Sequence, residues 1–226
     1  MRFLVWFTLL AFVALVILLP ILFGQLLITS LEKLHLSAGA AVALVIAIVL
    51  GGLVNIPVRR IVREGSDAAL DPFSAYRLPV PWQARATGPG VVIAVNLGGC
   101  VIPAGLALYE LYHLAAQGGT APFVALVAAS LNCFVCYRLA QPAPGIGIIM
   151  PGLVPPLVAA AAALLLAPGD TAAPVAFIAG VAGPLIGADL LHLRDIGRVG
   201  AGMASIGGAG TFDGIVLSGI VAAYLA

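Results

Sequence analysis

Long apolar segments separated by short polar ones make up almost the whole chain. Seven of them approach or exceed the length of roughly 20 residues that an α-helix needs to cross a bilayer. These segments are residues 3–28, 38–56, 90–112, 121–139, 148–167, 173–191 and 205–226. Backbone groups in lipid must pair within their own segment, so each is expected to be a helix. The pattern predicts an all-α, polytopic transmembrane bundle of about seven helices, which forms a single domain over residues 1–226.

The composition agrees with a protein that lies in a membrane. Of its residues, 62% are hydrophobic and 8% are charged, and its mean hydropathy of +1.18 is far above that of soluble domains. The first segment begins after Arg2, but its apolar run is too long for a signal peptide, so we expect it to be a span. The formal net charge of +1 gives no indication of nucleic-acid binding, because the basic residues are explained as topology determinants. We therefore expect membrane lipids as partners and no nucleic acid, and the sequence leaves the oligomeric state open.

Basic residues fall almost entirely on one side of the predicted bundle. With seven spans, Lys33 alone lies on the side opposite the N-terminus. The arginines on the N-terminal side are Arg2, Arg59, Arg60, Arg63, Arg77, Arg85, Arg138, Arg194 and Arg198. Because basic loops stay in the cytoplasm, the N-terminus is predicted inside and the C-terminus outside. Residues 57–89 then form a basic, proline-rich cytoplasmic loop, too short for a core of its own.

Two aspartates near the inner ends of the last two predicted helices are the candidate catalytic residues. Asp189 lies in GADLLHL and Asp213 lies in GGAGTFDGI. Ionisable residues inside a bundle are costly and indicate function. From the predicted helix ends, Asp189 would lie roughly 3 Å deep and Asp213 roughly 12 Å deep. The glycines before Asp213 favour a late helix start, which would bring both acids to a similar depth.

A pair of carboxylates in one partly buried site cannot both ionise at low cost. One therefore supplies an acid and the other a base, which together can activate water and protonate a leaving amide nitrogen. An aspartate on one helix and another behind GxG on the next resemble the GxGD-type intramembrane aspartyl proteases, the group of presenilin, signal peptide peptidase and the prepilin peptidases. The present chain has two extra residues between GxG and Asp213, and Ala188 replaces the usual tyrosine before Asp189.

This resemblance implies that Asp189 and Asp213 cleave a transmembrane or membrane-proximal peptide. We expect no cofactor and no metal in that reaction. Over the whole chain, GADLLHL together with GGAGTFDGI resembles the prokaryotic membrane family called domain of unknown function 1614. That resemblance implies a multi-pass protein of the cell (inner, cytoplasmic) membrane.

Glycines and prolines near the acids are predicted to bind the substrate. Gly208 and Gly210 would keep the chain before Asp213 open to a peptide. Pro142 and Pro144 belong to the run PAPGIGIIMPGLVPP, which makes the start of the fifth helix irregular. Irregular backbone at membrane depth is covered by protein or lines a cavity, so this run could bind an extended peptide. A kinked helix start is the alternative.

Other functions remain open for the two aspartates. They could form a pathway for protons or ions in a coupled transporter. They could also be structural in a non-enzymatic scaffold, where Arg194 or Arg198 would pair with them. Together with His192, Asp189 and Asp213 offer oxygen and imidazole ligands to a divalent metal. An interfacial position of His192 is the alternative to that metal site.

The remaining polar residues have simpler interpretations. Glu110 and His113 form an ExxH at the predicted outer face, where we expect both to anchor the helix beside neighbouring tyrosines. Cys133 and Cys136 are expected to pack as small apolar residues, and Asn132 to hydrogen-bond between helices. A faint repeat, GG-x5-G, occurs at residues 98–105 and 207–214. Its first two glycines allow close approach, so the third predicted helix should pack near the seventh.

Overall fold

The structure is a computed structural model of the 226-residue chain, and it describes residues 2–62, 90–143, 147–195, 203–208 and 213–226. The α-helices are α1 (Arg2–Glu32), α2 (Ala38–Gly51), α3 (Ile102–Gln117), α4 (Ala121–Leu139), α5 (Val154–Leu166), α6 (Ala172–Ala182) and α8 (Gly214–Leu225). Shorter helical elements are the π-helices η3 (Leu97–Val101) and η5 (Gly183–Leu190) and the 3-10 turn η4 (Gly169–Thr171). The strands are β1 (Asn55–Val62), β2 (Gly90–Asn96), β3 (Gln141–Ala143), β4 (Gly147–Ile149) and β5 (Met203–Ile206).

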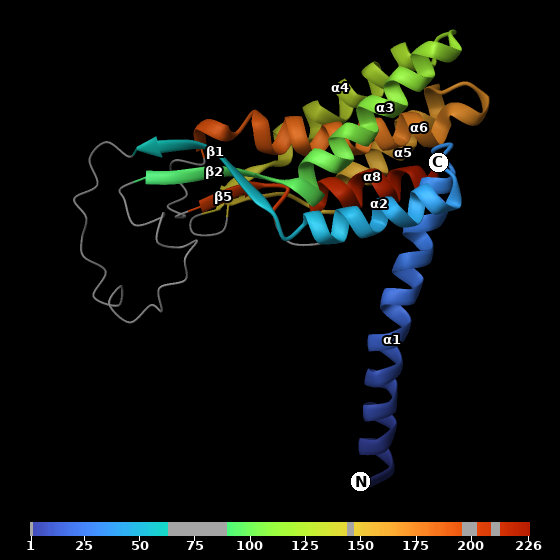
Figure 1. Ribbon diagram of the computed structural model, residues 1–226, viewed down its shortest axis with the longest axis vertical. Coiled ribbons are helices and arrows are strands. Elements are labelled where there is room, and N and C mark those ends of the chain that lie inside the picture. Colours follow the sequence, from blue (N-terminus) through green and yellow to red (C-terminus); the bar gives the residue numbers. More distant parts are fainter. Residues whose placement is uncertain (1, 63–89, 144–146, 196–202, 209–212) are drawn as a thin grey trace.

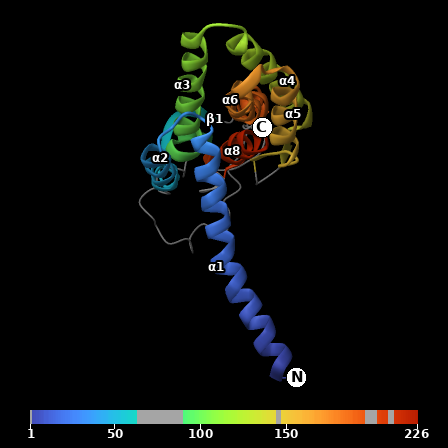
Figure 2. The same cartoon turned by 90° about the vertical axis from the view of Figure 1, so that its right-hand side faces the viewer.

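Helices α6 and α8 occupy the centre of the bundle. Figure 2 shows them nearly end-on, with α2 and α3 on one side and α4 and α5 on the other. The two central helices touch through small residues, since a Cβ on Gly180 would lie 2.7 Å from the carbonyl oxygen of Ser218. Phe177 fills the space beside Gly219 and is almost fully buried. Close backbone contact at small residues is typical of helix packing in membranes.

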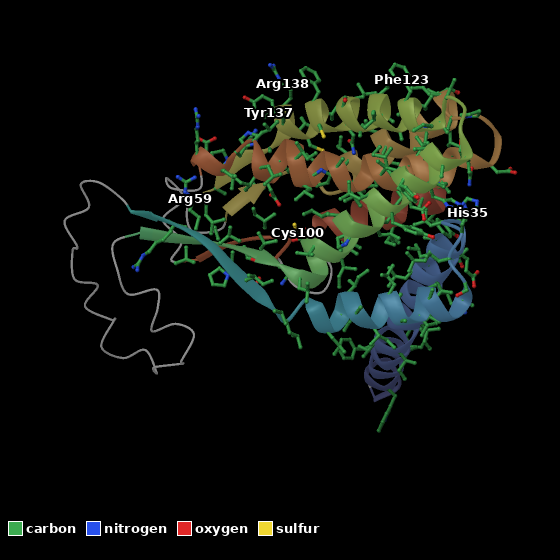
Figure 3. The ribbon with its side chains drawn as sticks, turned by 45° about the horizontal axis from the view of Figure 1, so that its top comes forward. His35, Arg59, Cys100, Phe123, Tyr137 and Arg138 are labelled. Carbon is green, nitrogen blue, oxygen red and sulfur yellow. The ribbon has the colours of Figure 1, made fainter. Side chains whose placement is uncertain are left out.

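Three helical stretches in the described part of the chain are long and apolar enough to cross a membrane. They are Leu97–Gln117, Ala121–Leu139 and Gly169–Asp195. Large apolar side chains of α4, such as Phe123 at 70% exposure, point away from the bundle (Figure 3). The chain is thus a mostly helical membrane protein, as its composition predicted.

Helix α1 matches the first predicted segment but leaves the bundle at a steep angle. Figure 1 shows its N-terminal part projecting far from the other helices. Its last turns are held, because Leu27 and Leu31 are buried against the core and Lys33, directly after the helix, donates a 2.8 Å hydrogen bond to the carbonyl oxygen of Tyr224. The attachment of α1 therefore lies at the end of the bundle opposite the sheet.

Several predicted helices are wrong at the ends near the predicted inner face, because those residues form strands. Residues 55–56, 90–96 and 205–206 belong to a sheet in the order β1-β2-β5, with β1 antiparallel and β5 parallel to β2. The sheet extends beyond the bundle in Figure 1. Strand β2 reads GVVIAVN, and its β-branched residues favour a strand. Hydropathy does not distinguish such a segment from the end of a buried helix.

The predicted fifth helix begins later than expected, after a hairpin. Residues 148–149 lie in β4, which pairs with β3, and α5 begins at Val154 with prolines in its first turn. Proline suits that position because the first helical amides need no partner within the helix. Of the predicted basic loop 57–89, residues 57–62 lie in β1 and the rest lie outside the described residues.

Candidate functional site

Asp213 stands directly before α8 and caps it. The helix begins at Gly214, so the prediction that glycines delay its start is confirmed. The Oδ1 atom of Asp213 accepts a 2.9 Å hydrogen bond from the backbone N–H of Ile215, and the side chain is 8% exposed. Its carboxylate thus lies at the positive end of the helix dipole, which favours a negative charge there.

Asp189 is carried by π-helix η5 rather than by a regular α-helical turn. Gly187 allows η5 to lie directly against α4, because a Cβ there would overlap the carbonyl oxygen of Cys133. Wider π-helical turns are frequent at functional sites, where they redirect side chains. Asp189 is partly buried, and its carboxylate accepts a hydrogen bond from the backbone of Gly207, which follows β5.

The structure brings the two predicted aspartates together. Asp189 and Asp213 are close enough for their charges to interact, and Cys100 of η3 lies near both. Glycines make this approach possible, since a Cβ on Gly99 would overlap the carbonyl oxygen of Gly207 and lie 3.2 Å from the Cβ of Asp213. Gly207 has φ of +70°, a conformation that favours glycine. We call the two aspartates, Cys100 and these two glycines the aspartate site.

The aspartate site lies where the helices meet the sheet. Figure 3 labels Cys100 at this junction, with Arg59 further out on the sheet and His35 at the opposite end of the bundle. Cys100 was not predicted to lie beside the acids. The signal was present in the GG-x5-G repeat, because Cys100 directly follows Gly99, which contacts Gly207 of the second copy.

Asn96, the last residue of β2, fastens Gly98 and Gly99 at the start of η3 to the sheet. Its Oδ1 accepts a 2.7 Å hydrogen bond from the backbone N–H of Gly99, which caps η3. Its amide donates to the carbonyl oxygen of Gly52 at 2.8 Å and to the side chain of Asn55 at 3.1 Å. The Ser205 hydroxyl of β5 also donates to Asn55, so the three strands are linked beside the aspartate site.

The predicted substrate-binding residues are partly brought to this site. Gly208 lies in the turn after β5, and its N–H donates a 3.2 Å hydrogen bond to the carbonyl oxygen of Ser205. Pro142 is exposed on β3, and the hairpin packs through residues 148 and 150 against Ala188, the neighbour of the first aspartate. Gly210 and Pro144 lie outside the described residues.

His192 does not join the aspartates in a metal site. Its Nδ1 lies 3.0 Å and 3.2 Å from the carbonyl oxygens of Ala188 and Gly187, and its ring lies 4.9 Å from the ring of Tyr137. The ring is therefore buried against its own helix and against Tyr137 of α4. Among the residues that the structure describes, no group of three or more His, Cys, Asp or Glu side chains could hold a metal ion.

The prediction that Glu110 anchors α3 at the membrane surface is wrong. Its side chain is 0% exposed, and both of its carboxylate oxygens lack a hydrogen-bond partner within the described structure. The Ser218 hydroxyl of α8 is likewise buried without a partner there. Glu110 follows Leu106 by four residues and Ala107 by three, and Leu114 follows it by four; all three are buried. Because residues three and four apart share one helix face, this apolar spacing was a signal for the burial of Glu110.

The predictions for the polar residues of α4 are confirmed. The Asn132 amide donates a 2.9 Å hydrogen bond to the carbonyl oxygen of Ala179 on α6. Cys136 is buried, and the Cys133 thiol donates to the carbonyl oxygen of Ala182 at 3.1 Å. Both cysteines are free thiols that pack at the contact of α4 with the broken sixth helix.

A sequence-family profile matches most of the chain. The profile is described as "Protein of unknown function (DUF1614)", and it matches residues 49–225. The match begins at the end of α2 and includes the sheet, the aspartate site and the helices from α3 to α8, but not α1. No curated protein and no solved structure matches this chain.

Proposed function

Since the chain belongs to the DUF1614 family, whose function is unknown, we propose a hydrolytic function for the acid pair at its centre. Asp189 and Asp213 would act as an acid–base pair that cleaves a peptide within or next to the membrane. The observation that carries the proposal is that two acids from different helices lie within electrostatic reach of each other. Each is also oriented by a backbone N–H, Asp189 by Gly207 and Asp213 by Ile215.

The proposed chemistry needs only these two carboxyl groups and water. The charged carboxylate takes a proton from water, and the water oxygen attacks the peptide carbonyl carbon. The protonated carboxyl group then supplies a proton to the amide nitrogen as the C–N bond breaks. Two neighbouring carboxyls favour this division of roles, because a shared, partly buried site disfavours two negative charges.

The position of β5 supports a peptide as the substrate. Among the described strands, β5 lies at one edge of the sheet, and it leads directly to Gly207 and then toward Asp213. An extended peptide can add to such an edge through backbone hydrogen bonds. Gly208 follows β5 and Gly207 directly and so lies on this path. Gly210, Pro142 and Pro144 remain predicted substrate-binding residues.

The charge distribution supports a cytoplasmic position for the aspartate site. Arg59 and Arg138 lie toward the sheet end of the molecule, whereas Lys33 lies beside His35 at the other end (Figure 3). By the positive-inside rule, the sheet end would face the cytoplasm of a prokaryotic cell. The proposal keeps seven spans, with the N-terminus inside and the C-terminus outside.

Replacing the aspartates tests the hydrolytic function. Purified protein, Asp189→Asn, Asp213→Asn and the double variant would be incubated with a library of transmembrane peptides, and the products identified by mass spectrometry. Each single change should lower cleavage on the order of a thousandfold, and the double change should cost little more because the residues act as a unit. Asp170→Asn, which changes an exposed acid, is the matched control. Cleavage at the normal rate by either single variant would exclude the acid–base pair.

Coupled transport of a proton or ion is the second candidate function. Its supporting observation is that α6 gives way to the π-helix η5 at the aspartate site, where the helices η3–α3 and α8 also begin after strands. Interrupted helices of this kind form substrate and ion sites in transporters. Proton-driven uptake into proteoliposomes that is lost in Asp213→Asn, without peptide cleavage, would favour transport. A non-enzymatic scaffold would show neither activity.

A further inference from the structure

Glu110 is an acid that the proposed hydrolysis does not use. It lies on the buried face of α3, fully enclosed, with no hydrogen-bond partner for either oxygen among the described residues. A charged carboxylate in such surroundings is costly, by several kcal/mol in proteins. The carboxylate therefore requires a cation, and the smallest cation that such an enclosed position can take is a proton.

Among the described residues, no Lys or Arg side chain from the helices packed against α3 pairs with Glu110. Neither α2 nor α6 carries a titratable side chain. The titratable groups of the other elements that contact α3 are Cys100 on η3, Cys133, Cys136, Tyr137 and Arg138 on α4, and Tyr224 on α8. Arg138 lies in the last turn of α4, near the sheet end. Lys33 from the end of α1 instead donates to the backbone carbonyl oxygen of Tyr224 at 2.8 Å.

Ser218 lies between Glu110 and the aspartate site in depth. Gly99 contacts Asp213, so the segments that lead into α3 and α8 start from one level, and α3 then rises obliquely away from α8 (Figures 1 and 2). At 1.5 Å per residue, Ser218 lies roughly 7 Å along α8 and Glu110 roughly 16 Å along α3 from that level. The two side chains that are buried without partners in the described structure therefore continue the series of polar groups that begins at Asp213.

The outer end of this series reaches protonatable groups near the surface. His113 follows Glu110 by one helical turn, and its ring lies 5.5 Å from the ring of His35 and 6.1 Å from that of Tyr109. Residues three apart on a helix share a face, and imidazole exchanges protons near neutral pH. His113 and His35 are thus placed to pass protons between water and Glu110.

We propose that Glu110 is a proton-binding site in a path across the bundle, with Ser218 linking it to the aspartate site. Protons would pass between the outer histidines, Glu110, Ser218 and Asp213, with water molecules bridging the gaps between these groups. This path goes beyond peptide hydrolysis, and it stands whether or not the aspartates cleave peptides.

Proton flux into liposomes tests the proposal. The full-length protein would be reconstituted with a pH-sensitive dye inside, and flux driven by a potassium diffusion potential. Glu110→Gln keeps the shape of the side chain but cannot exchange a proton, so flux should fall about a hundredfold, as expected for a lost proton-transfer group. Ser218→Ala should cause a smaller loss. Glu32→Gln, at an exposed acid of α1, should conduct like the wild type.

A chemical probe on the wild-type protein keeps the test independent of whether Glu110→Gln folds. A hydrophobic carbodiimide adds to a protonated carboxylic acid. The acid oxygen bonds to the carbodiimide carbon, and the proton goes to a carbodiimide nitrogen. Mass spectrometry should locate the rearranged adduct at Glu110, with a parallel loss of flux. Wild-type liposomes that conduct no better than empty ones, normal flux in Glu110→Gln, or absence of the Glu110 adduct would each overturn the proposal.

Discussion

Two units of the molecule follow the same plan, in which a strand leads through paired glycines to a helix. In the first, β2 leads through Gly98 and Gly99 to η3 and α3; in the second, β5 leads through Gly207 and Gly208 to α8. Their strands are parallel neighbours, and Gly99 of the first unit touches Gly207 of the second. The faint GG-x5-G repeat of the sequence thus corresponds to two similar units placed side by side.

The units differ in the residue that caps the helix. Asn96 caps the first directly after its strand, and its neutral amide makes three hydrogen bonds to the surrounding backbone and side chains. Asp213 caps the second several residues after the glycines, and its charge lies beside Asp189. The same strand–glycine–helix arrangement thus serves two purposes. The neutral cap fastens the fold, whereas the charged cap places an acid where chemistry is possible.

Gly99→Ala should have the largest effect on this pairing of units. The added Cβ would overlap backbone atoms of Gly207, which the β2–β5 pairing holds in place. We expect destabilisation of about 3 kcal/mol or more, since overpacking against backbone relaxes poorly. Gly105→Ala is the control, because its Cβ would meet no atom within 4 Å. It should be neutral or stabilising by up to about 1 kcal/mol.

Unfolding can be followed in detergent with a thiol-reactive fluorophore, because Cys100 and Cys136 are buried in the folded protein. The dye should react with Gly99→Ala at a clearly lower temperature than with the wild type. An unchanged melting temperature for Gly99→Ala would mean that the two units do not touch as described.

Asn96→Ala should have the next largest effect. It removes the cap of η3 and leaves the carbonyl oxygen of Gly52 and the N–H of Gly99 without their partner. Buried groups that lose a hydrogen bond typically cost about 1–3 kcal/mol each. Because Gly52 is only half-buried, we expect both losses at the low end of that range, about 2–3 kcal/mol together. The same thermal assay measures this loss, and a variant as stable as the wild type would contradict the fastening role of Asn96.

Replacing Asp213 should have the smallest effect on stability. Asp213→Ala loses the hydrogen bond to Ile215 and should cost about 1 kcal/mol, whereas Asp213→Asn caps equally well and should cost almost nothing. Both should lose peptide cleavage if the carboxylate is catalytic. The contrast would fail if Asp213→Asn were destabilised as much as Asn96→Ala, because Asp213 would then fasten the fold in the same way.

Much of the candidate site was predictable because burying an acid is costly. Asp189 and Asp213 stood out as acids inside apolar segments, and the glycines before Asp213 correctly indicated a late helix start. The burial of Glu110 was missed, because an ExxH near a predicted helix end looked interfacial. Its position on the buried face of α3 depends on which side of the helix the rest of the bundle covers.

The sequence by itself determined the membrane class, the approximate positions of the helices and the two aspartates, since hydropathy and the cost of buried charge act locally along the chain. Only the tertiary structure decided where the helices give way to strands. Residues 90–96 and 203–206 are as apolar as helix ends, and they become strands because they pair with each other and with β1 across long stretches of sequence. The same non-local pairing brings Gly99 against Gly207. Asp189 and Asp213 meet there because backbone can approach backbone where no Cβ intervenes.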